Sequence, residues 1–200
     1  MGMQMIVSEG VLNPTLFTAS KVFAKTVAKW LPLEPCDVLE LGCGSGIASL
    51  VAAAKGHRVL AVDIDPRAIG DTLANAGRNQ LQVETALSDW DSGIDPDRCF
   101  DRVICNPPFL PGGQLSFGTA LEAGSNGEVL IAAIRAMVRR LKPAGRGLLM
   151  TSSQTPRPVL HQVIEKDPGI EGHVLCSRRH WQERLLFDEL VKRKEVPGLG

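Results

Sequence analysis

Short apolar runs alternate with longer amphipathic stretches along most of this 200-residue chain. The runs have the length of buried strands, and the amphipathic stretches repeat their apolar positions at helical spacing. Such alternation predicts an α/β domain with a doubly wound, mostly parallel sheet. The expected strands are 38–41, 58–62, 81–86, 100–105, 147–151, 173–177 and 184–190. The expected helices are 15–30, 47–55, 66–79, 128–141 and 161–166.

Two of the expected helices have clear local signals. Asp65 and Pro66 mark a helix start, with an N-cap followed by proline at the first helical position. That helix carries Ala68, Ile69, Leu73 and Ala76. The helix at 128–141 directs one apolar face towards the core, formed by Leu130, Ile134, Met137 and Leu141. We expect Lys142-Pro143-Ala144-Gly145 to end it.

The first strand runs directly into three glycines at alternate positions, Gly42, Gly44 and Gly46. A strand that turns into a helix through glycines lets backbone N–H groups and a helix N-terminus approach a ligand closely. The next strand ends in Asp63, 21 residues after Gly42. Doubly wound nucleotide-binding folds place a ribose-binding carboxylate at about this distance.

The third and fourth strands also end in distinctive residues. Asp89 is placed to accept a hydrogen bond from a purine amino group, and Ile64 or Trp90 could pack on the base. Asp89 alone would serve equally well as a turn cap. Asn106-Pro107-Pro108-Phe109 closes the fourth strand with two residues that lack N–H groups. The Asn106 side-chain oxygen and the Pro107 carbonyl can therefore accept both hydrogens of a substrate NH2 group.

These motifs together resemble the class I, Rossmann-like S-adenosylmethionine-dependent methyltransferases, and among them the amino-group methyltransferases with an Asn/Asp-Pro-Pro-Phe/Tyr motif. The resemblance covers about residues 11–192, and 40–46 match the family's first motif. It implies a seven-stranded sheet of order 3-2-1-4-5-7-6 whose last strand, 184–190, is antiparallel. It also implies one domain over residues 1–200, with a cofactor-covering segment and helix at 1–31 and the core at 32–192.

The resemblance implies a role for each matching residue. Cofactor-binding residues would be Glu40, Gly42, Gly44, Gly46, Asp63, Ile64, Asp89, Trp90 and Asn106. Catalysis would fall to Asn106, Pro107 and Phe109, and acceptor binding to Asn106, Pro107, Pro108 and Phe109. The cofactor would be S-adenosyl-L-methionine, with S-adenosyl-L-homocysteine as product. No metal is expected.

The methyl acceptor is less well specified. Ser88-Asp89-Trp90 with Asn-Pro-Pro looks like the HemK-type enzymes that methylate glutamine in release factors, and 172–190 is similar to their short eukaryotic and archaeal members. Phe109 stands where those enzymes have tyrosine, as in adenine- and guanine-methylating relatives, and the separate N-terminal helical domain of the bacterial enzymes has no counterpart. We expect a protein glutamine; a nucleobase amino group in RNA or DNA, or a small-molecule amine, remains open. A non-catalytic, cofactor-binding partner subunit is a further alternative, as is an enzyme that needs an activating partner.

Charge and composition restrict the possible partners and location of the protein only slightly. The 22 basic and 22 acidic residues are unevenly spread: residues 1–134 hold nine basic and fifteen acidic residues, and 135–200 hold thirteen and seven. The basic last third leaves a nucleic-acid partner open, although solvated helix faces explain it equally well. The five cysteines show no CxxC spacing. With no apolar run of membrane-spanning length and no secretory signal, we expect a cytoplasmic protein without membrane contact.

Overall fold

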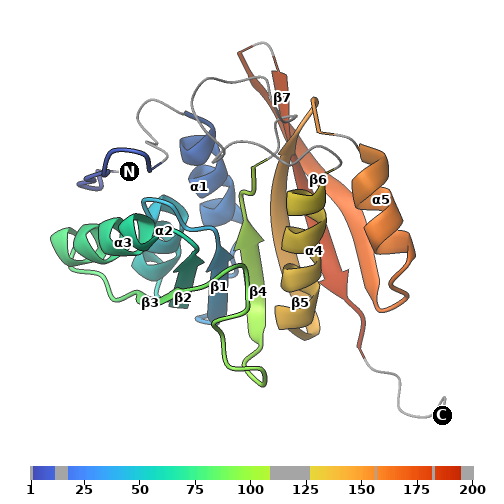
Figure 1. Ribbon diagram of the computed structural model, residues 1–200, viewed down its shortest axis with the longest axis horizontal. Coiled ribbons are helices and arrows are strands. Elements are labelled where there is room, and N and C mark those ends of the chain that lie inside the picture. Colours follow the sequence, from blue (N-terminus) through green and yellow to red (C-terminus); the bar gives the residue numbers. More distant parts are fainter. Residues whose placement is uncertain (1, 12–17, 109–126, 156, 182, 195–200) are drawn as a thin grey trace.

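One sheet organises the molecule, with helices packed on both of its faces (Figure 1). The structure, a computed structural model, describes residues 2–11, 18–108, 127–155, 157–181 and 183–194. Within these residues the strands are β1 Asp37–Leu41, β2 Arg58–Asp63, β3 Glu84–Leu87, β4 Phe100–Cys105, β5 Leu141–Ser152, β6 Ile170–His180 and β7 Glu183–Lys192. The helices are α1 Thr18–Trp30, α2 Ile47–Ala54, α3 Pro66–Arg78, α4 Glu128–Arg140 and α5 Arg157–Glu165.

The strand order is β3-β2-β1-β4-β5-β7-β6, which confirms the expected topology. Pairs among the first five strands are parallel, and β7 runs antiparallel to both β5 and β6. The carboxyl ends of β1 to β5 therefore share one edge of the sheet with the beginning of β7. Ligands of doubly wound sheets bind at this edge.

Alternate residues of the central strands feed two hydrophobic clusters, one on each face of the sheet. Val38 packs beneath α1 and α2, together with Phe23 and Phe187. Its neighbour Leu39 packs on the other face, among apolar residues of α4 that include the predicted inner face of that helix. Both faces are thus covered, as a parallel sheet requires. Helix α3 lies beside α2, at the β3 side of the molecule (Figure 1).

Several element boundaries differ from the prediction for local reasons. The third strand begins at Glu84 rather than Leu81, because the Leu81 N–H bonds the Ala76 carbonyl and so belongs to the end of α3. The segment 142–145 does not separate α4 from the next strand. Instead, Leu141 already pairs with Phe100, and a register shift accommodates Ala144 at a φ of 63°.

The last three elements are longer than the sequence suggested. Helix α5 begins at Arg157 rather than His161, and β6 and β7 form an extended hairpin. Most of β6 is exposed, so its side chains lack the apolar alternation that marks a strand. The first part of the expected helix at 15–30 falls outside the described residues, as do residues 12–14 of the cofactor-covering segment before it.

Candidate active site

Three adjacent strands bring predicted site residues together at one edge of the sheet. The last residue of β1 pairs with Val62 of β2 on one side and with Cys105 of β4 on the other. Gly42, Asp63 and Asn106 therefore follow strands that lie side by side. Residues 64 positions apart in the sequence are neighbours here because β1 lies between β2 and β4.

The glycine loop after β1 presents an open surface. Gly42 and Gly44 have φ values of 70° and 54°, in the region that glycine adopts readily. A Cβ atom added at either position would meet nothing within 4 Å. The backbone is therefore bare at these two positions, and a bound molecule can approach it closely.

The loop's donors, however, are already used within the protein. The N–H groups of Gly42 and Cys43 both donate to the Val62 carbonyl, at 2.9 and 3.0 Å. The Gly44 N–H donates to Asp63 Oδ2 at 2.9 Å. The expectation that this loop offers its N–H groups to a ligand is wrong for these three residues. The loop contributes space rather than an anion cradle.

Gly46 has a different task from the other two glycines. It caps α2 with a φ of 81°, and an added Cβ would lie 2.7 Å from Thr72 Oγ1. Its missing side chain lets α2 approach α3. Gly46 is buried, so the structure gives this predicted cofactor-binding residue a packing role.

Glu40 is a buried carboxyl group on β1. Its Oε2 accepts a hydrogen bond from the Ser49 N–H at 2.7 Å and a short one from the Ser49 hydroxyl. Burial, the largest cause, and the nearby Asp63 charge together raise the pKa of Glu40 from 4.5 to about 8, against the two Ser49 hydrogen bonds, which lower it. At neutral pH the carboxyl group is therefore mostly protonated.

Asp63 stands at the end of β2 with both oxygens engaged. Oδ2 holds the Gly44 N–H, and Oδ1 accepts a hydrogen bond from the Asp65 N–H at 3.0 Å. These bonds fix the carboxylate, and each oxygen keeps a second lone pair for a ligand. The following residue, Ile64, is 67% exposed, so its side chain is free to cover a planar group.

The turn after β4 holds a buried polar atom without a partner. Asn106 Oδ1 is inaccessible to solvent and accepts no hydrogen bond from the residues that the structure describes. Pro107 is buried and Pro108 is half-buried, and neither can donate a backbone hydrogen bond. Phe109, the last residue of the predicted motif, lies outside the described residues. An unpaired buried acceptor is rare and suits a group that binds a donor from outside.

Comparison with known proteins identifies the family. Residues 13–166 match the family model described as the methyltransferase small domain. The chain belongs to this family. It is an S-adenosylmethionine-dependent methyltransferase domain, and its sheet is that of the Rossmann-like methyltransferases.

Two curated methyltransferases illustrate the likeness. A release factor glutamine methyltransferase of Koribacter versatilis is 39% identical over 112 residues, which are 54% of this chain and 39% of that protein. A putative protein N5-glutamine methyltransferase of Methanocaldococcus jannaschii is 29% identical over 153 residues, or 72% of this chain and 76% of that protein. The chain thus spans about two fifths of the length of the first relative.

A solved methyltransferase shares the fold at lower identity. The 16S rRNA methyltransferase of T. thermophilus, in complex with AdoMet and guanosine, has a TM-score of 0.66 and 23% sequence identity. The match covers 94% of this chain and 45% of that protein. At this identity the likeness concerns the fold.

The residues of this methyltransferase site fit S-adenosylmethionine. The bare backbone at Gly42 and Gly44 leaves room for a ligand directly above β1. The fixed carboxylate of Asp63 is suited to a ribose diol, and the exposed side chains of Asp89 and Ile64 follow the neighbouring strands. Asn106 adds an acceptor that nothing in the described protein satisfies.

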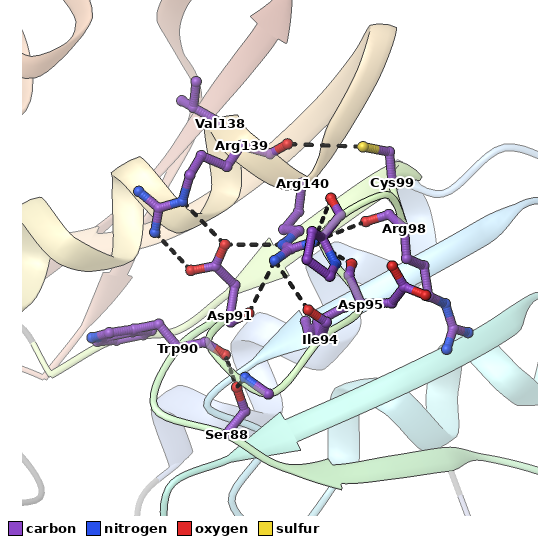
Figure 2. A network of polar contacts seen from close by, with 12 residues as sticks. Ser88, Trp90, Asp91, Ile94, Asp95, Arg98, Cys99, Val138, Arg139 and Arg140 are labelled. Atoms are coloured by element: carbon purple, nitrogen blue, oxygen red, sulfur yellow. Dashed lines mark hydrogen bonds and ion pairs between the residues drawn. The ribbon is translucent and has the colours of Figure 1, made fainter.

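A clamp that the sequence analysis missed holds the loop carrying Asp89 and Trp90 (Figure 2). Asp91, two residues after Asp89, accepts hydrogen bonds from Arg139 Nη2 at 2.6 Å and Arg140 Nε at 2.9 Å. Arg140 is buried and also bonds several loop carbonyls, including that of Asp95 at 2.6 Å. Trp90 has a φ of 50° and packs against the core.

The only sequence signal for this clamp is the arginine pair at the end of α4. Basic residues in a last helical turn are common, because they interact favourably with the helix dipole. Nothing in their spacing indicates Asp91, which is 48 residues away. The clamp fixes the loop from beneath, and Asp89 remains exposed beside it.

A second missed feature is a ladder along α3, formed by side chains four residues apart. The pairs are Gln4 N with Asn79 Oδ1 at 3.0 Å, Ile6 N with Asn75 Oδ1 at 2.7 Å, and Ser8 N with Asp71 Oδ2 at 2.7 Å. The N-terminal segment therefore runs along the helix towards its amino end, at the ligand edge of the sheet. The signal was present as Asp71, Asn75 and Asn79 at helical spacing.

The two cysteines beside the site, Cys43 and Cys105, are small buried residues. Burial raises the pKa of both thiols well above the ordinary value. They are thus not activated as nucleophiles. In the part of the chain that the structure describes, each helix is too short or too polar to cross a membrane.

Proposed function

We propose that this domain transfers the methyl group of S-adenosylmethionine to an amide or amino nitrogen held at the Asn106 turn. The observation that carries the proposal is the buried, unpaired Asn106 Oδ1 at the end of β4. An acceptor NH2 group would donate one hydrogen to this oxygen and the other to the Pro107 carbonyl. The acceptor would thereby satisfy an atom that is costly to leave unpaired.

Two such hydrogen bonds would activate the acceptor nitrogen as well as bind the acceptor. The lone pair of an amide or exocyclic amine is delocalised, which makes the nitrogen a poor nucleophile. Bonds to Asn106 and Pro107 would localise this lone pair and direct it at the methyl group. They would also stabilise the positive charge that develops on the nitrogen, which is an electrostatic contribution. Pro108 and Phe109 complete the motif as residues that position a planar acceptor.

The residues that would hold the donor follow the neighbouring strands. We assign the ribose hydroxyls to Asp63, the adenine amino group to Asp89, and the faces of the adenine to Ile64 and Trp90. When bound, S-adenosylmethionine supplies an electrophilic methyl group. Orienting the two reactants can lower the activation barrier by about 7–11 kcal/mol.

Glu40 would respond to the donor through its charge. A ligand ammonium group near this carboxyl would favour its ionised form, against the burial that keeps it neutral. Binding at neutral pH would then release a proton from Glu40. Gly42 and Gly44 would provide the space, and Gly46 would only hold α2 in place.

The first candidate acceptor is a glutamine side chain in a protein. The supporting evidence is the likeness to two proteins named as glutamine methyltransferases, one of which this chain covers over 76% of its length. The Ser88-Asp89-Trp90 and Asn106-Pro107-Pro108 residues agree with this assignment.

The second candidate acceptor is a nucleobase amino group. Its support comes from the β6–β7 hairpin, whose end carries exposed arginines and an exposed tryptophan. An exocyclic amine on a base has the same planar NH2 geometry as an amide. The Asn106 turn would therefore serve both acceptors by the same two hydrogen bonds.

The test is transfer of labelled methyl from S-adenosylmethionine into a cell extract that is then separated into protein, nucleic acid and small molecules. Label that is protease-sensitive and yields methylglutamine on hydrolysis supports the first candidate. Label in RNA or DNA supports the second. Label confined to small molecules contradicts both acceptors, and bound cofactor without any transfer would indicate a missing partner subunit.

A further inference from the structure

The β6–β7 hairpin projects past the end of β5 at the ligand edge of the sheet (Figure 1). The last residue of β5, Ser152, pairs with Leu185 of β7. Residues 179–181, 183 and 184 lie beyond this pair, and we call them the hairpin tip. Because β7 is antiparallel to β5, the hairpin tip stands at the same edge as the Asn106 turn.

Two arginines face each other across the hairpin tip. Arg179 and Arg184 are directly paired in the register of β6 and β7, and both are exposed. Within the described part of the chain, neither forms an ion pair with a carboxylate. Like charges directly opposite each other destabilise a strand pair. Arg178, the preceding residue of β6, is also exposed and points to the opposite face of the hairpin.

The acidic residue of the hairpin tip does not neutralise these charges. Glu183 pairs across the strands with His180, and its Oε1 lies 3.7 Å from His180 Nδ1. The other oxygen of Glu183 is buried and has no hydrogen-bond partner among the described residues. Successive strand residues point to opposite faces, so Glu183 and the adjacent Arg184 face different ways.

A flat aromatic surface completes the hairpin tip. Trp181 is 79% exposed, although tryptophan is usually well buried. It stacks on His180, with 5.9 Å between the ring centroids and an interplanar angle of 13°. His180 is in turn held by the Thr18 hydroxyl of α1, which lies 2.6 Å from Nε2. The exposed ring is thus pre-positioned on a fixed support.

We propose that the hairpin tip binds single-stranded nucleic acid, with Arg179 and Arg184 sharing backbone phosphates and Trp181 stacking on a base. Phosphates between the two arginines would relieve their repulsion, because guanidinium groups bind phosphate in a bidentate manner. An aromatic face that accepts any base is the usual complement of such a basic surface. An acidic peptide would satisfy the arginines but would leave the exposed tryptophan face without a planar partner. The inference deepens the second candidate of the proposed function, since the bound strand would lead to the Asn106 turn.

Binding can be measured without methyl transfer. The probe is a fluorescein-labelled single-stranded RNA of mixed sequence and about twelve nucleotides, followed by fluorescence anisotropy. Relative to wild type, the Arg179→Gln/Arg184→Gln variant should bind about tenfold or more weakly, and its salt slope should fall by about 1.4, since each phosphate contact contributes about 0.7. Trp181→Ala should weaken binding by about tenfold, as expected for loss of one stacked base.

Controls separate this role from a structural one. The matched variant Arg58→Gln/Arg193→Gln removes two exposed arginines far from the hairpin tip and should bind the RNA as wild type does. The tip double variant should melt no lower than wild type, because it removes a like-charge pair. Equal RNA binding by the tip variant and wild type would overturn the proposal. So would equally effective competition by a polyglutamate peptide of the same length.

The same assay keeps this inference separate from the proposed function. Adding Arg179→Gln/Arg184→Gln to an Asn106→Ala background should weaken RNA binding by the same factor as in wild type, even where methyl transfer is lost. Transfer that depends on Asn106, combined with no RNA binding at the hairpin tip, would remove the inference and leave the proposed chemistry standing.

Discussion

An amide oxygen that is buried without a hydrogen-bond partner costs about 1–3 kcal/mol. Asn106 Oδ1 carries this cost directly after β4, next to the glycine loop. Proteins tolerate such an atom where it has a task, and the two prolines that follow add no donor to satisfy it. The free energy that a bound NH2 group recovers there is the driving force we assign to acceptor binding.

Replacing this residue tests the assignment. Asn106→Ala should lower turnover by about 10²–10³, the range for loss of one oriented group that stabilises developing charge. Affinity for S-adenosylmethionine should stay close to wild type, because Asp63 and the glycine loop are unchanged. Single-turnover methyl transfer and calorimetric titration of the cofactor measure the two effects separately. If cofactor binding disappeared together with activity, Asn106 would have a different role.

Glu40 gives the domain a pH-dependent stability. Its pKa is about 8 in the folded protein and 4.5 when unperturbed. The folded state therefore binds more protons than the unfolded state between these values, and the free energy of unfolding falls as pH rises. The contribution is fully present below pH 4.5 and is lost as pH passes through about 8.

The variant Glu40→Gln removes the titrating group and keeps a hydrogen-bonding side chain. Its free energy of unfolding should depend much less on pH between 5 and about 8 than that of wild type. Urea denaturation at several pH values measures the difference. The exposed Glu34→Gln is the matched control and should follow the wild-type curve. Parallel curves for wild type and Glu40→Gln would contradict the raised pKa.

Among the elements, the loop between β3 and β4 depends on α4 for its position. Asp91 is its anchor, and Arg140 is buried with that carboxylate as its ionic partner. The neighbouring Trp90 adopts a positive φ, which non-glycine residues avoid unless their surroundings enforce it. The clamp therefore holds a strained residue in place at the edge of the active site.

Removing the anchor should be costly. Asp91→Ala leaves a buried guanidinium without its counter-charge and should reduce the free energy of unfolding by about 3–5 kcal/mol. Urea denaturation checks this, and tryptophan fluorescence should report the altered setting of Trp90. The exposed Asp97→Ala, in the same loop, is the control and should change stability by less than about 0.5 kcal/mol.

Elements with an apolar periodicity were predictable, and polar contacts between them were not. Strand β4 and the inner face of α4 match the structure because burial alone explains them. On α3 the same reasoning selected Leu73, which is 49% exposed, while the buried positions include Asp71 and Asn75. Those side chains are buried by the N-terminal segment, a partner that periodicity does not reveal.

The strand-end motifs were predictable as neighbours because the topology of a doubly wound sheet fixes where they meet. The use made of each residue was harder to foresee. Gly46 serves packing against Thr72, and the N–H groups of the loop serve β2. Both outcomes depend on distances between segments far apart in the sequence.

Across the whole molecule, some basic residues of the last third, 135–200, form ion pairs with carboxylates and others do not. The pairs are Arg139 and Arg140 with Asp91, Lys142 with Asp37 and Asp101, Arg146 with Glu189, Arg157 with Asp188, and Arg193 with Glu171. In the described part of the chain, Arg178, Arg179 and Arg184 have no such partner. Three of the charges without an ion pair therefore lie together at the end of the β6–β7 hairpin, near the active-site edge.

Cofactor binding should stabilise the entire domain. At a concentration 100-fold above its dissociation constant, S-adenosylmethionine should add about 2.7 kcal/mol to the free energy of unfolding. For a domain of this size the melting temperature should rise by about 5–11 °C. Asp63→Ala should lose most of this shift, whereas the exposed Asp97→Ala should keep it. A full shift in Asp63→Ala would contradict the ribose assignment.

The ladder joins α3 to the extended segment 4–8, and the spacing of successive rungs is nearly equal on the two elements. Four helical residues advance about 6.0 Å and two extended residues about 6.6 Å. The offset between each α3 side chain and its backbone partner therefore grows by about 0.6 Å per rung. Three rungs stay within hydrogen-bond reach. At the position of a fourth stands Arg67, whose long side chain absorbs the drift and bonds the Glu9 carbonyl at 3.1 Å. Insertion of one residue between Gln4 and Ser8 would shift the backbone N–H groups out of register with the α3 side chains, and insertion of two residues would restore the register.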